Sequence, residues 1–173
     1  MRSEVSLLAV IIFLLLYDLI AGEKGMKYFQ PVAIIVFAVH ILATIFPYEA
    51  GIAFGGMYQY SPMMTIVKGI LNLGTLIVFL QAKEVFDGDK QSNKRGEYYF
   101  LTLITLLGMY FMISSGHFLM FYIGLEMASI PLATLAALEK YSKKSAEAGA
   151  KYILIAAFSS GIMLFGISYL YGS

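Results

Sequence analysis

Residues 118–138 read FLMFYIGLEMASIPLATLAAL, and Glu126 is the one charged residue among them. An apolar stretch of about 20 residues is long enough, as a helix, to cross the ~30 Å hydrocarbon layer of a membrane. A single segment that crosses a bilayer has to be helical, because the hydrocarbon offers the backbone no water to bond to. The stretch therefore predicts a transmembrane helix with a carboxyl group near its middle.

The whole chain has the composition of an integral membrane protein. Of its 173 residues, 60% are hydrophobic and 13% are charged, and the mean hydropathy is +0.78. A soluble domain could not bury so much apolar side chain, so we expect the lipid bilayer to be its main partner. The net charge is only +1 and no cluster of basic residues lies outside the short connections, so no nucleic-acid partner is predicted.

Six apolar stretches predict an all-α, polytopic bundle of six transmembrane helices. They are residues 5–21, 29–46, 62–82, 98–114, 118–138 and 145–170. One helix over 98–138 would be roughly 60 Å long, about twice the hydrocarbon thickness, so we predict a turn at the sequence SSGH, 114–117. Ser145 is the predicted N-cap of the sixth helix, with Glu147 in its first turn.

The basic residues of the predicted connections lie almost all on one side of the membrane. Arg2 lies on one side with the connections 47–61 and 114–117, which hold no lysine or arginine. The other side receives nine: Lys24, Lys27, Lys83, Lys90, Lys94, Arg95, Lys140, Lys143 and Lys144. By the positive-inside rule, the second side is cytoplasmic and the N-terminus lies outside. The first segment carries Glu4 and Asp18 and no clear A-x-A site, which indicates a retained helix and not a cleaved signal peptide.

No cofactor or metal site is predicted within this chain. The sequence contains no cysteine, which excludes disulfides, thiolate metal sites and cysteine-ligated iron–sulfur clusters from these residues. It also contains no glycine fingerprint of a dinucleotide-binding fold, so neither NADH nor quinone binding is predicted here. Any redox chemistry would have to be carried by other subunits.

The carboxyl group of Glu126 predicts a proton-exchange site. An ionisable group in the middle of a spanning helix costs at least ~2.5 to 3.5 kcal/mol on insertion scales, and such groups usually have a function and a partner. Glu126 is about nine residues from the outer end of its helix, or about 14 Å deep. At that depth the group either holds a proton or keeps a cation or water beside it. The alternative is a structural role, as a protonated acid bonded to nearby backbone.

Lys151 is the predicted partner of Glu126 in proton transfer. It follows Ser145 by six residues, so it lies about 9 Å below the cytoplasmic surface, and the two α-carbons then differ in depth by about 7 Å. Small residues predict close contact between the two helices. They are Gly124, Ala128, Ser129 and Ala133 on one helix and Gly149, Ala150, Ala156 and Ala157 on the other. In the alternative, Lys151 extends to the cytoplasmic interface and pairs with Glu147 one turn earlier.

Two further polar residues within the spans, His40 and Lys68, are candidate proton-relay residues. A lone histidine in a span is otherwise typical of a hydrogen bond between helices, and Lys68 is near enough to its helix end to extend outward. Asp18 and His117 are predicted at the membrane interfaces. The connection 47–61 holds three tyrosines and three glycines, which predicts a flexible cover or an aromatic belt at the outer interface.

Two motifs resemble a known family. They are GLEMASIP at 124–131 and, after a basic connection, SAEAGAKYILIAAFSSGIMLFGISYLYG at 145–172. This pair is similar to the pattern GLELxSLP followed by SxEAxxKY in the antiporter-like membrane subunit N of NADH-quinone oxidoreductase, respiratory complex I. The resemblance is specific over 96–172, and the three earlier helices fit in arrangement only. Subunits L and M and the multisubunit cation/proton antiporters share the same pattern in outline.

The resemblance implies a function for the chain. Glu126 matches the family's essential carboxylate and Lys151 the lysine on the following helix, in a module that translocates protons while another part of the complex reduces quinone. NADH, FMN, iron–sulfur clusters and quinone are then expected in other subunits, and other membrane subunits of the complex are the expected partners. The expected location is the cell inner (plasma) membrane.

The resemblance also implies a division of the chain. Residues 1–95 would form a three-helix membrane region with a cytoplasmic loop, and residues 96–173 the start of the antiporter-like module. Family members have more than a dozen helices, so we expect this chain to be the N-terminal part only. Two alternatives remain at this point: a subunit of a multisubunit sodium/proton antiporter, and a structural membrane scaffold whose buried ion pair fixes helix register.

Overall fold

The computed structural model describes residues 1–47, 49–87, 94–139 and 141–172, and the side chains of these except 21–27, 83–85 and 87. Within this part the chain is almost entirely helical, which confirms the predicted all-α membrane bundle. The elements are α1 (Arg2–Thr44), β1 (Gly51–Ala53), η1 (Phe54–Gly56), β2 (Tyr58–Tyr60), α2 (Pro62–Asp87), α3 (Lys94–Ile113), α4 (Phe118–Ala136) and α5 (Lys143–Gly172).

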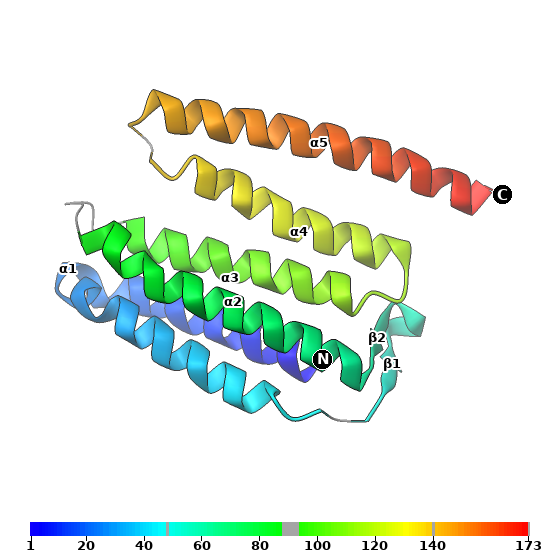
Figure 1. The fold of residues 1–173 in the computed structure, drawn as a ribbon, viewed down its shortest axis with the longest axis horizontal. Helices are drawn as coiled ribbons and strands as arrows, with labels where there is room; N and C mark the ends of the chain where they lie inside the picture. Colours follow the sequence, from blue (N-terminus) through cyan, green and yellow to red (C-terminus); the bar gives the residue numbers. More distant parts are fainter. Residues whose placement is uncertain (48, 88–93, 140, 173) are drawn as a thin grey trace.

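Helix α1 is not straight, although its helical backbone is continuous. The Ser6 hydroxyl lies 2.9 Å from the His40 ring, 34 residues later, whereas a straight helix would separate these residues by about 51 Å. Figure 1 shows the chain turning back on itself within α1. The two arms are Arg2–Ile20 and Tyr28–Thr44, and they correspond to the predicted spans 5–21 and 29–46.

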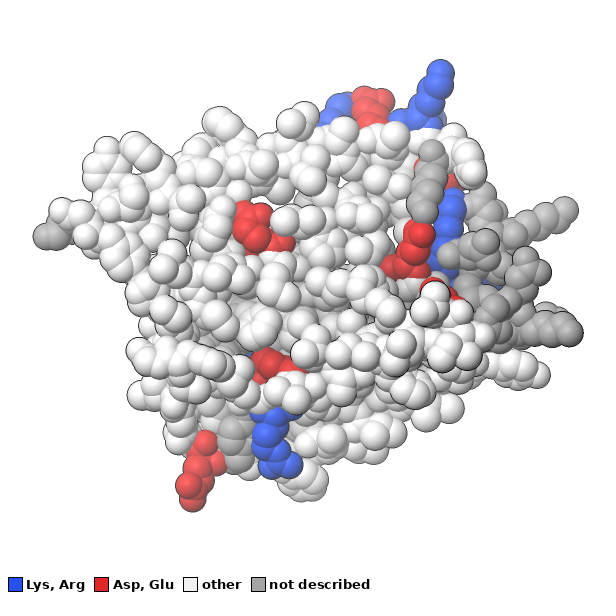
Figure 2. Space-filling view, turned by 180° about the vertical axis from the view of Figure 1, so that it is seen from behind, with Lys and Arg blue, Asp and Glu red and all other residues white. Residues whose placement is uncertain are grey.

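Five helical segments are long and apolar enough to cross a membrane. They are Arg2–Ile20, Pro62–Ala82, Lys94–Ile113, Phe118–Ala136 and Lys143–Gly172, and the arm Tyr28–Thr44 is a shorter apolar helix. Figure 2 shows a broad uncharged surface on the rear face, interrupted by a few acidic side chains, with most of the charges near its edges. The chain is a multi-pass membrane protein.

Helix α3 occupies the centre of the bundle. It packs against α1 and α2 on one side and against α4 on the other, and α5 packs mainly on α4 (Figure 1). The core between α1, α2 and α3 combines aliphatic side chains with several aromatic rings, and the ring centroids of Phe79 and Tyr99 lie 4.6 Å apart in an edge-on arrangement. Such a pair adds roughly 0.5–1.5 kcal/mol to its packing.

Small residues occur at two helix interfaces, that of α3 with α4 and that of α4 with α5. A Cβ atom added to Gly108 of α3 would lie 2.5 Å from the backbone nitrogen of Ala128, and one added to Gly124 would lie 2.8 Å from that of Met112. The prediction that Gly124 and Ala128 line the contact with the following helix is therefore wrong, because these residues bring α4 against α3. A Cβ added to Gly149 would meet the Cβ of Ala137 at 2.5 Å, so Gly149 does serve the predicted contact between α4 and α5.

The connection between α1 and α2 contains a short antiparallel hairpin in which β1 pairs with β2. The hairpin is fixed to the predicted 114–117 turn: the Gln59 N–H donates to the Ser114 carbonyl at 2.8 Å, and the Gly116 N–H donates to the Met57 carbonyl at 2.7 Å. Tyr58 and Tyr60 are 2% and 5% exposed. The predicted flexible cover or aromatic belt is wrong for these two tyrosines, because backbone pairing turns them inward; Tyr48 lies outside the described residues.

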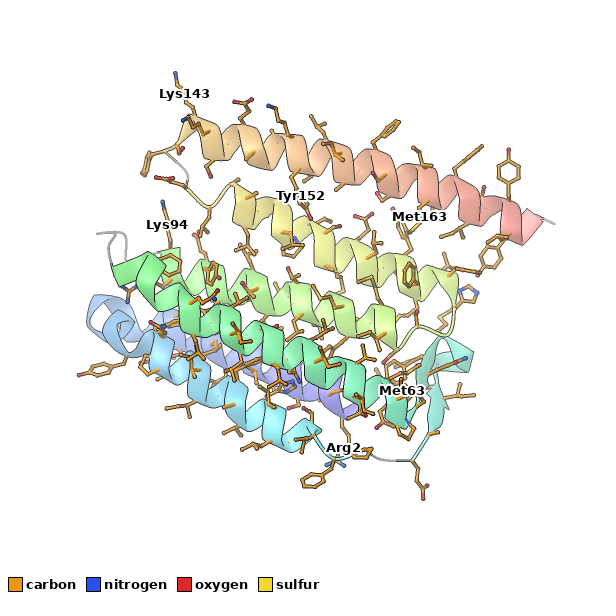
Figure 3. The ribbon with its side chains drawn as sticks, in the orientation of Figure 1. Arg2, Met63, Lys94, Lys143, Tyr152 and Met163 are labelled. Carbon is orange, nitrogen blue, oxygen red and sulfur yellow. The ribbon has the colours of Figure 1, made fainter. Side chains whose placement is uncertain are left out.

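The ends of the helices follow the predicted alternation. Figure 3 shows Lys94 and Lys143 at one end of the bundle and Arg2 toward the other. Of the nine basic residues counted in the sequence, Lys90 and Lys140 lie outside the described residues, as do the side chains of Lys24, Lys27 and Lys83. Helix α5 begins two residues earlier than predicted, and its first turn is capped by Ser142, whose hydroxyl accepts from the Ser145 N–H at 3.4 Å.

Candidate functional site

Glu126 lies in the middle of α4, and its side chain is partly buried. Its Oε1 atom is buried and has no hydrogen-bond partner among the residues that the structure describes. A buried acceptor without a partner costs roughly 1–3 kcal/mol, and more when it is charged. At 100° per residue, Glu126 is about 200° around the helix from Gly124, so it lies on the side of α4 away from α3. Protonation of this carboxyl group would lower the cost of its burial.

Lys151 lies on the surface of the described structure. Its Nζ atom is 2.5 Å from Oε1 of Glu147, one turn earlier, and the two side chains are 69% and 63% exposed. The structure thus brings Lys151 to Glu147, the alternative partner named above, and the described side chains include no hydrogen bond or ion pair between Lys151 and Glu126.

The helical phase of α5 explains this placement. Gly149, Ser160 and Ile167 are the buried residues of α5, and Figure 3 shows Tyr152 and Met163 on the side of the helix that faces α4. Lys151 follows Gly149 by two residues, or about 200° around the helix. It therefore projects from the side of α5 opposite to α4.

A second cluster of charged groups lies between α1, α2 and the end of α3. The Lys68 ammonium forms an ion pair with the Glu4 carboxylate, and the side chains are 4% and 3% exposed. Lys68 also donates to the hydroxyls of Ser114 at 2.7 Å and Ser3 at 3.4 Å. Ser3 donates to Oε2 of Glu4 at 3.1 Å. We call Ser3, Glu4, Lys68 and Ser114 the Glu4–Lys68 cluster.

A chain of neutral polar groups adjoins this cluster. The Tyr110 hydroxyl donates to Oδ1 of Asn72 at 2.6 Å and lies 3.3 Å from Nε2 of His40. Because Tyr110 gives its one hydroxyl hydrogen to Asn72, its oxygen accepts from Nε2–H of His40. In the neutral ring, Nδ1 of His40 then accepts from the Ser6 hydroxyl at 2.9 Å. The Lys68 ammonium lies 5.1 Å from the centre of the Tyr110 ring, so both groups of residues contact Tyr110.

The structure therefore places the four predicted site residues in three positions. His40 and Lys68, the candidate relay residues, lie close together in buried polar networks, whereas Glu126 and Lys151 lie apart on α4 and α5. The outward extension of Lys68 is excluded by its burial. Sequence reasoning missed Ser3, Ser114, Asn72 and Tyr110, and treated Glu4 only as a mark of a retained helix. An acid in the first apolar span was the available signal for Glu4.

The two residues predicted at the interfaces make local contacts. A Cβ atom on Gly96 would collide with the Asp18 carboxylate, so α1 and α3 approach each other closely there. The His117 ring accepts from the Leu119 N–H at 3.3 Å at the start of α4 and lies 2.6 Å from the Tyr171 hydroxyl. Among the described residues, no three histidine, aspartate or glutamate side chains form a group that could hold a metal ion.

Comparison with known proteins assigns the family. The family model for "NADH:quinone oxidoreductase/Mrp antiporter, TM" matches residues 115–173. The chain is 50% identical over 173 residues to NADH-quinone oxidoreductase subunit N of Phocaeicola vulgatus. The aligned region covers 100% of this chain and 36% of that protein. The chain belongs to the subunit N family of NADH-quinone oxidoreductase.

Other members of the subunit N family are similar over nearly the same range. The protein from Azobacteroides pseudotrichonymphae is 49% identical over 174 residues, 99% of this chain and 36% of that protein. The protein from Neisseria gonorrhoeae is 38% identical over 172 residues, 98% of this chain and 35% of that protein. The chain thus spans about a third of the length of these relatives.

The similarity to the subunit N family extends beyond the motifs that predicted it. It includes the first three spans, for which the sequence indicated a common arrangement only. Glu126 and Lys151 lie within the matched residues 115–173, whereas Glu4, His40 and Lys68 precede them.

Proposed function

We propose that this subunit N chain forms part of a proton-translocating NADH-quinone oxidoreductase, and that Glu126 accepts and releases a proton during translocation. The observation that supports this function best is the buried, unpartnered Oε1 atom of Glu126 in the middle of a spanning helix. In the charged state this oxygen is poorly stabilised by the described residues. Binding a proton and releasing it to water is the chemistry for which such a group is suited.

Lys151 is the second proton-transfer residue of the proposal. It acts from its position beside Glu147, so transfer between Lys151 and Glu126 passes through water and does not use a direct hydrogen bond. Breaking the exposed Lys151–Glu147 pair costs little, roughly 0.3–0.5 kcal/mol for a pair spaced i,i+4 on a helix. Lys151 is thus able to change partners as the charge on Glu126 changes.

The proposal includes the orientation of the chain in the membrane, its two regions, and the assignment of the cofactors to other subunits of the complex. The basic connections face the cytoplasm and the N-terminus lies outside the cell inner (plasma) membrane. Residues 1–95 form a three-helix region and residues 96–173 begin the antiporter-like module. NADH, FMN, iron–sulfur clusters and quinone are bound by other subunits, and quinone reduction there supplies the energy for proton movement.

The test is a Glu126→Gln substitution in the full-length subunit within the assembled complex. Glutamine keeps the size of the side chain and cannot release a proton at neutral pH. We expect quinone-driven proton uptake by inverted membrane vesicles to fall by about tenfold or more, as for loss of a proton-transfer group, with a normal amount of subunit in the complex. The matched control is Glu139→Gln, since Glu139 is exposed in the connection after α4. Wild-type uptake by an assembled Glu126→Gln complex would contradict the proposal.

A second candidate function is sodium/proton antiport, because the matched family model also covers antiporter subunits. The two functions are distinguished by the driving force of proton movement. Proton movement that requires NADH and quinone, and that an imposed sodium gradient does not produce, supports the first. Proton movement driven by a sodium gradient without quinone supports the second.

A further inference from the structure

We propose that the pocket between α1 and α2 is a water-filled inlet that connects the surface, at the end of the bundle opposite the basic connections, with a second proton-exchange site, the Glu4–Lys68 cluster. The identity of the exchanged ion as a proton rests on the proposed function. The existence of the inlet and its contact with the cluster do not depend on the proposed function. No residue of this site belongs to the part of the chain that the family model matches.

The pocket is large enough for water and has one polar wall. Its volume is about 320 Å³, many times the roughly 30 Å³ that one water molecule occupies in the liquid. Ser3, Lys68, Asn72 and Tyr110 all line it, and Arg2 lies at its rim. Buried water needs two to four polar partners, and these side chains provide them. The other walls are mainly apolar residues of α1, α2 and the start of the connection 47–61.

The pocket borders the Glu4–Lys68 cluster, whose side chains are otherwise buried. Lys68 is 3% exposed as a residue, and so is Glu4, yet Lys68 and its partner Ser3 form part of the pocket wall. The three hydrogens of the Lys68 ammonium are directed to Glu4, Ser114 and Ser3. Lys68 is therefore fully hydrogen-bonded within the cluster, and water in the pocket is the cluster's route for exchange with the outside.

The exchange step changes only the position of one proton. A hydronium ion in the inlet gives its proton to the Ser3 hydroxyl, which lines the pocket, and Ser3 passes its own hydrogen to Oε2 of Glu4. A carboxyl O–H bond forms on Glu4, and a water molecule remains in the inlet. The neutral carboxyl group then holds Lys68 less strongly, and return of the proton to inlet water restores the ion pair. Besides Lys68, the α-ammonium of Met1 lies 3.6 Å from Glu4. Among the described residues, the other titratable groups around the pocket and cluster are Arg2, His40, Tyr58 and Tyr110.

The neutral chain of hydrogen bonds starts from the same pocket. Asn72 and Tyr110 line the pocket, and Tyr110 continues through His40 to Ser6. Ser6, His40 and Tyr110 can each give one hydrogen while taking another, and the amide oxygen of Asn72 accepts from Tyr110. The inlet thus contacts both the charged cluster and a hydrogen-bonded path that leads deeper into the bundle along α1.

The first experiment measures access of water and uses two glycines of α2. Gly69 lines the pocket and Gly74 does not, and a Cβ atom at either position would meet nothing within 4 Å. Each is changed to cysteine in the full-length subunit of the assembled complex, with any other reactive cysteine of the subunit replaced; residues 1–173 contain none. A membrane-impermeant, charged methanethiosulfonate is then added to either side of sealed vesicles.

We expect Gly69→Cys to react about tenfold faster than Gly74→Cys, because a thiol must ionise in water before it reacts. The reaction should occur from the side opposite the basic connections. Equal rates at the two positions, or reaction of Gly69→Cys only from the side of the basic connections, would overturn the inlet. This readout is independent of pumping, so it holds or fails whatever Glu126→Gln shows.

The second experiment separates proton exchange from a purely structural ion pair. The double substitution Glu4→Leu with Lys68→Met replaces both charges by apolar side chains of similar size, and such replacements usually preserve stability. We expect the double variant to assemble and to pump fewer protons per NADH oxidised, while Gly69→Cys in this background remains accessible. Pumping at the wild-type ratio by the double variant would show that the pair only fixes the helices, and would overturn the exchange site. If the double variant does not assemble, the number of protons pumped per NADH oxidised is measured for Glu4→Gln. A wild-type ratio for that variant would likewise overturn the exchange site.

Discussion

Lys68 of α2 and Glu4 of α1, 64 residues apart in the sequence, form an ion pair whose two side chains are 4% and 3% exposed. Two helices with few other polar contacts are joined at this point. Charges buried in this way are costly to separate, because removal of one leaves the other without a partner in a medium that solvates it poorly.

Lys68→Met alone is therefore expected to destabilise the subunit more than the double variant. The single change leaves the buried Glu4 carboxylate with serine hydroxyls and the more exposed Met1 ammonium beside it, at a cost of up to about 3–5 kcal/mol, whereas the double change removes both charges. Thermal unfolding of the purified complex in detergent measures the difference. Equal unfolding temperatures for the single and double variants would show that Glu4 does not depend on Lys68 for its stability.

Gly108→Ala is expected to separate α3 from α4. The added Cβ would lie 2.5 Å from the backbone nitrogen of Ala128, and neither backbone can yield without moving the helix. Overpacking of this kind costs roughly 1–3 kcal/mol or more. Gly74→Ala is the matched control, because its Cβ would meet nothing within 4 Å and alanine favours a helix over glycine.

The amount of assembled complex and its unfolding temperature provide the measurement for this pair. A decrease for Gly108→Ala with no decrease for Gly74→Ala supports the close contact of α3 and α4. Equal values for the two variants would mean that the helices are not in contact at Gly108.

Tyr110→Phe is expected to destabilise the neutral hydrogen-bonded chain. The change removes the hydroxyl that joins Asn72 to His40 and leaves two buried polar groups without it, at roughly 1–3 kcal/mol for each unsatisfied group. Tyr169→Phe is the control, since Tyr169 is 66% exposed. Unfolding temperatures of the two variants should differ clearly, and a Tyr110→Phe value equal to the control would contradict the buried chain.

The spans of this bundle could be predicted because their signal is local. Length and apolar composition alone place a helix at 118–138, and the structure has Phe118–Ala136. The Glu4–Lys68 pair has no such signal, since it forms only when α1 has turned back and α2 has passed beside its first arm. The predicted position of Lys151, facing Glu126, was wrong for a different reason. Small residues lie all around α5, so the sequence did not indicate which face of this helix meets α4.

Lys151→Met tests a residue whose loss should affect transport without affecting the fold. Its ion pair with Glu147 is exposed and spaced i,i+4, and such pairs contribute about 0.3–0.5 kcal/mol. The unfolding temperature should therefore remain close to that of Lys144→Met, a control at the exposed start of the same helix. If Lys151 exchanges protons as proposed, only Lys151→Met lowers proton uptake per NADH oxidised. Equal uptake by the two variants would remove Lys151 from the proposed path and leave Glu126 to act without it.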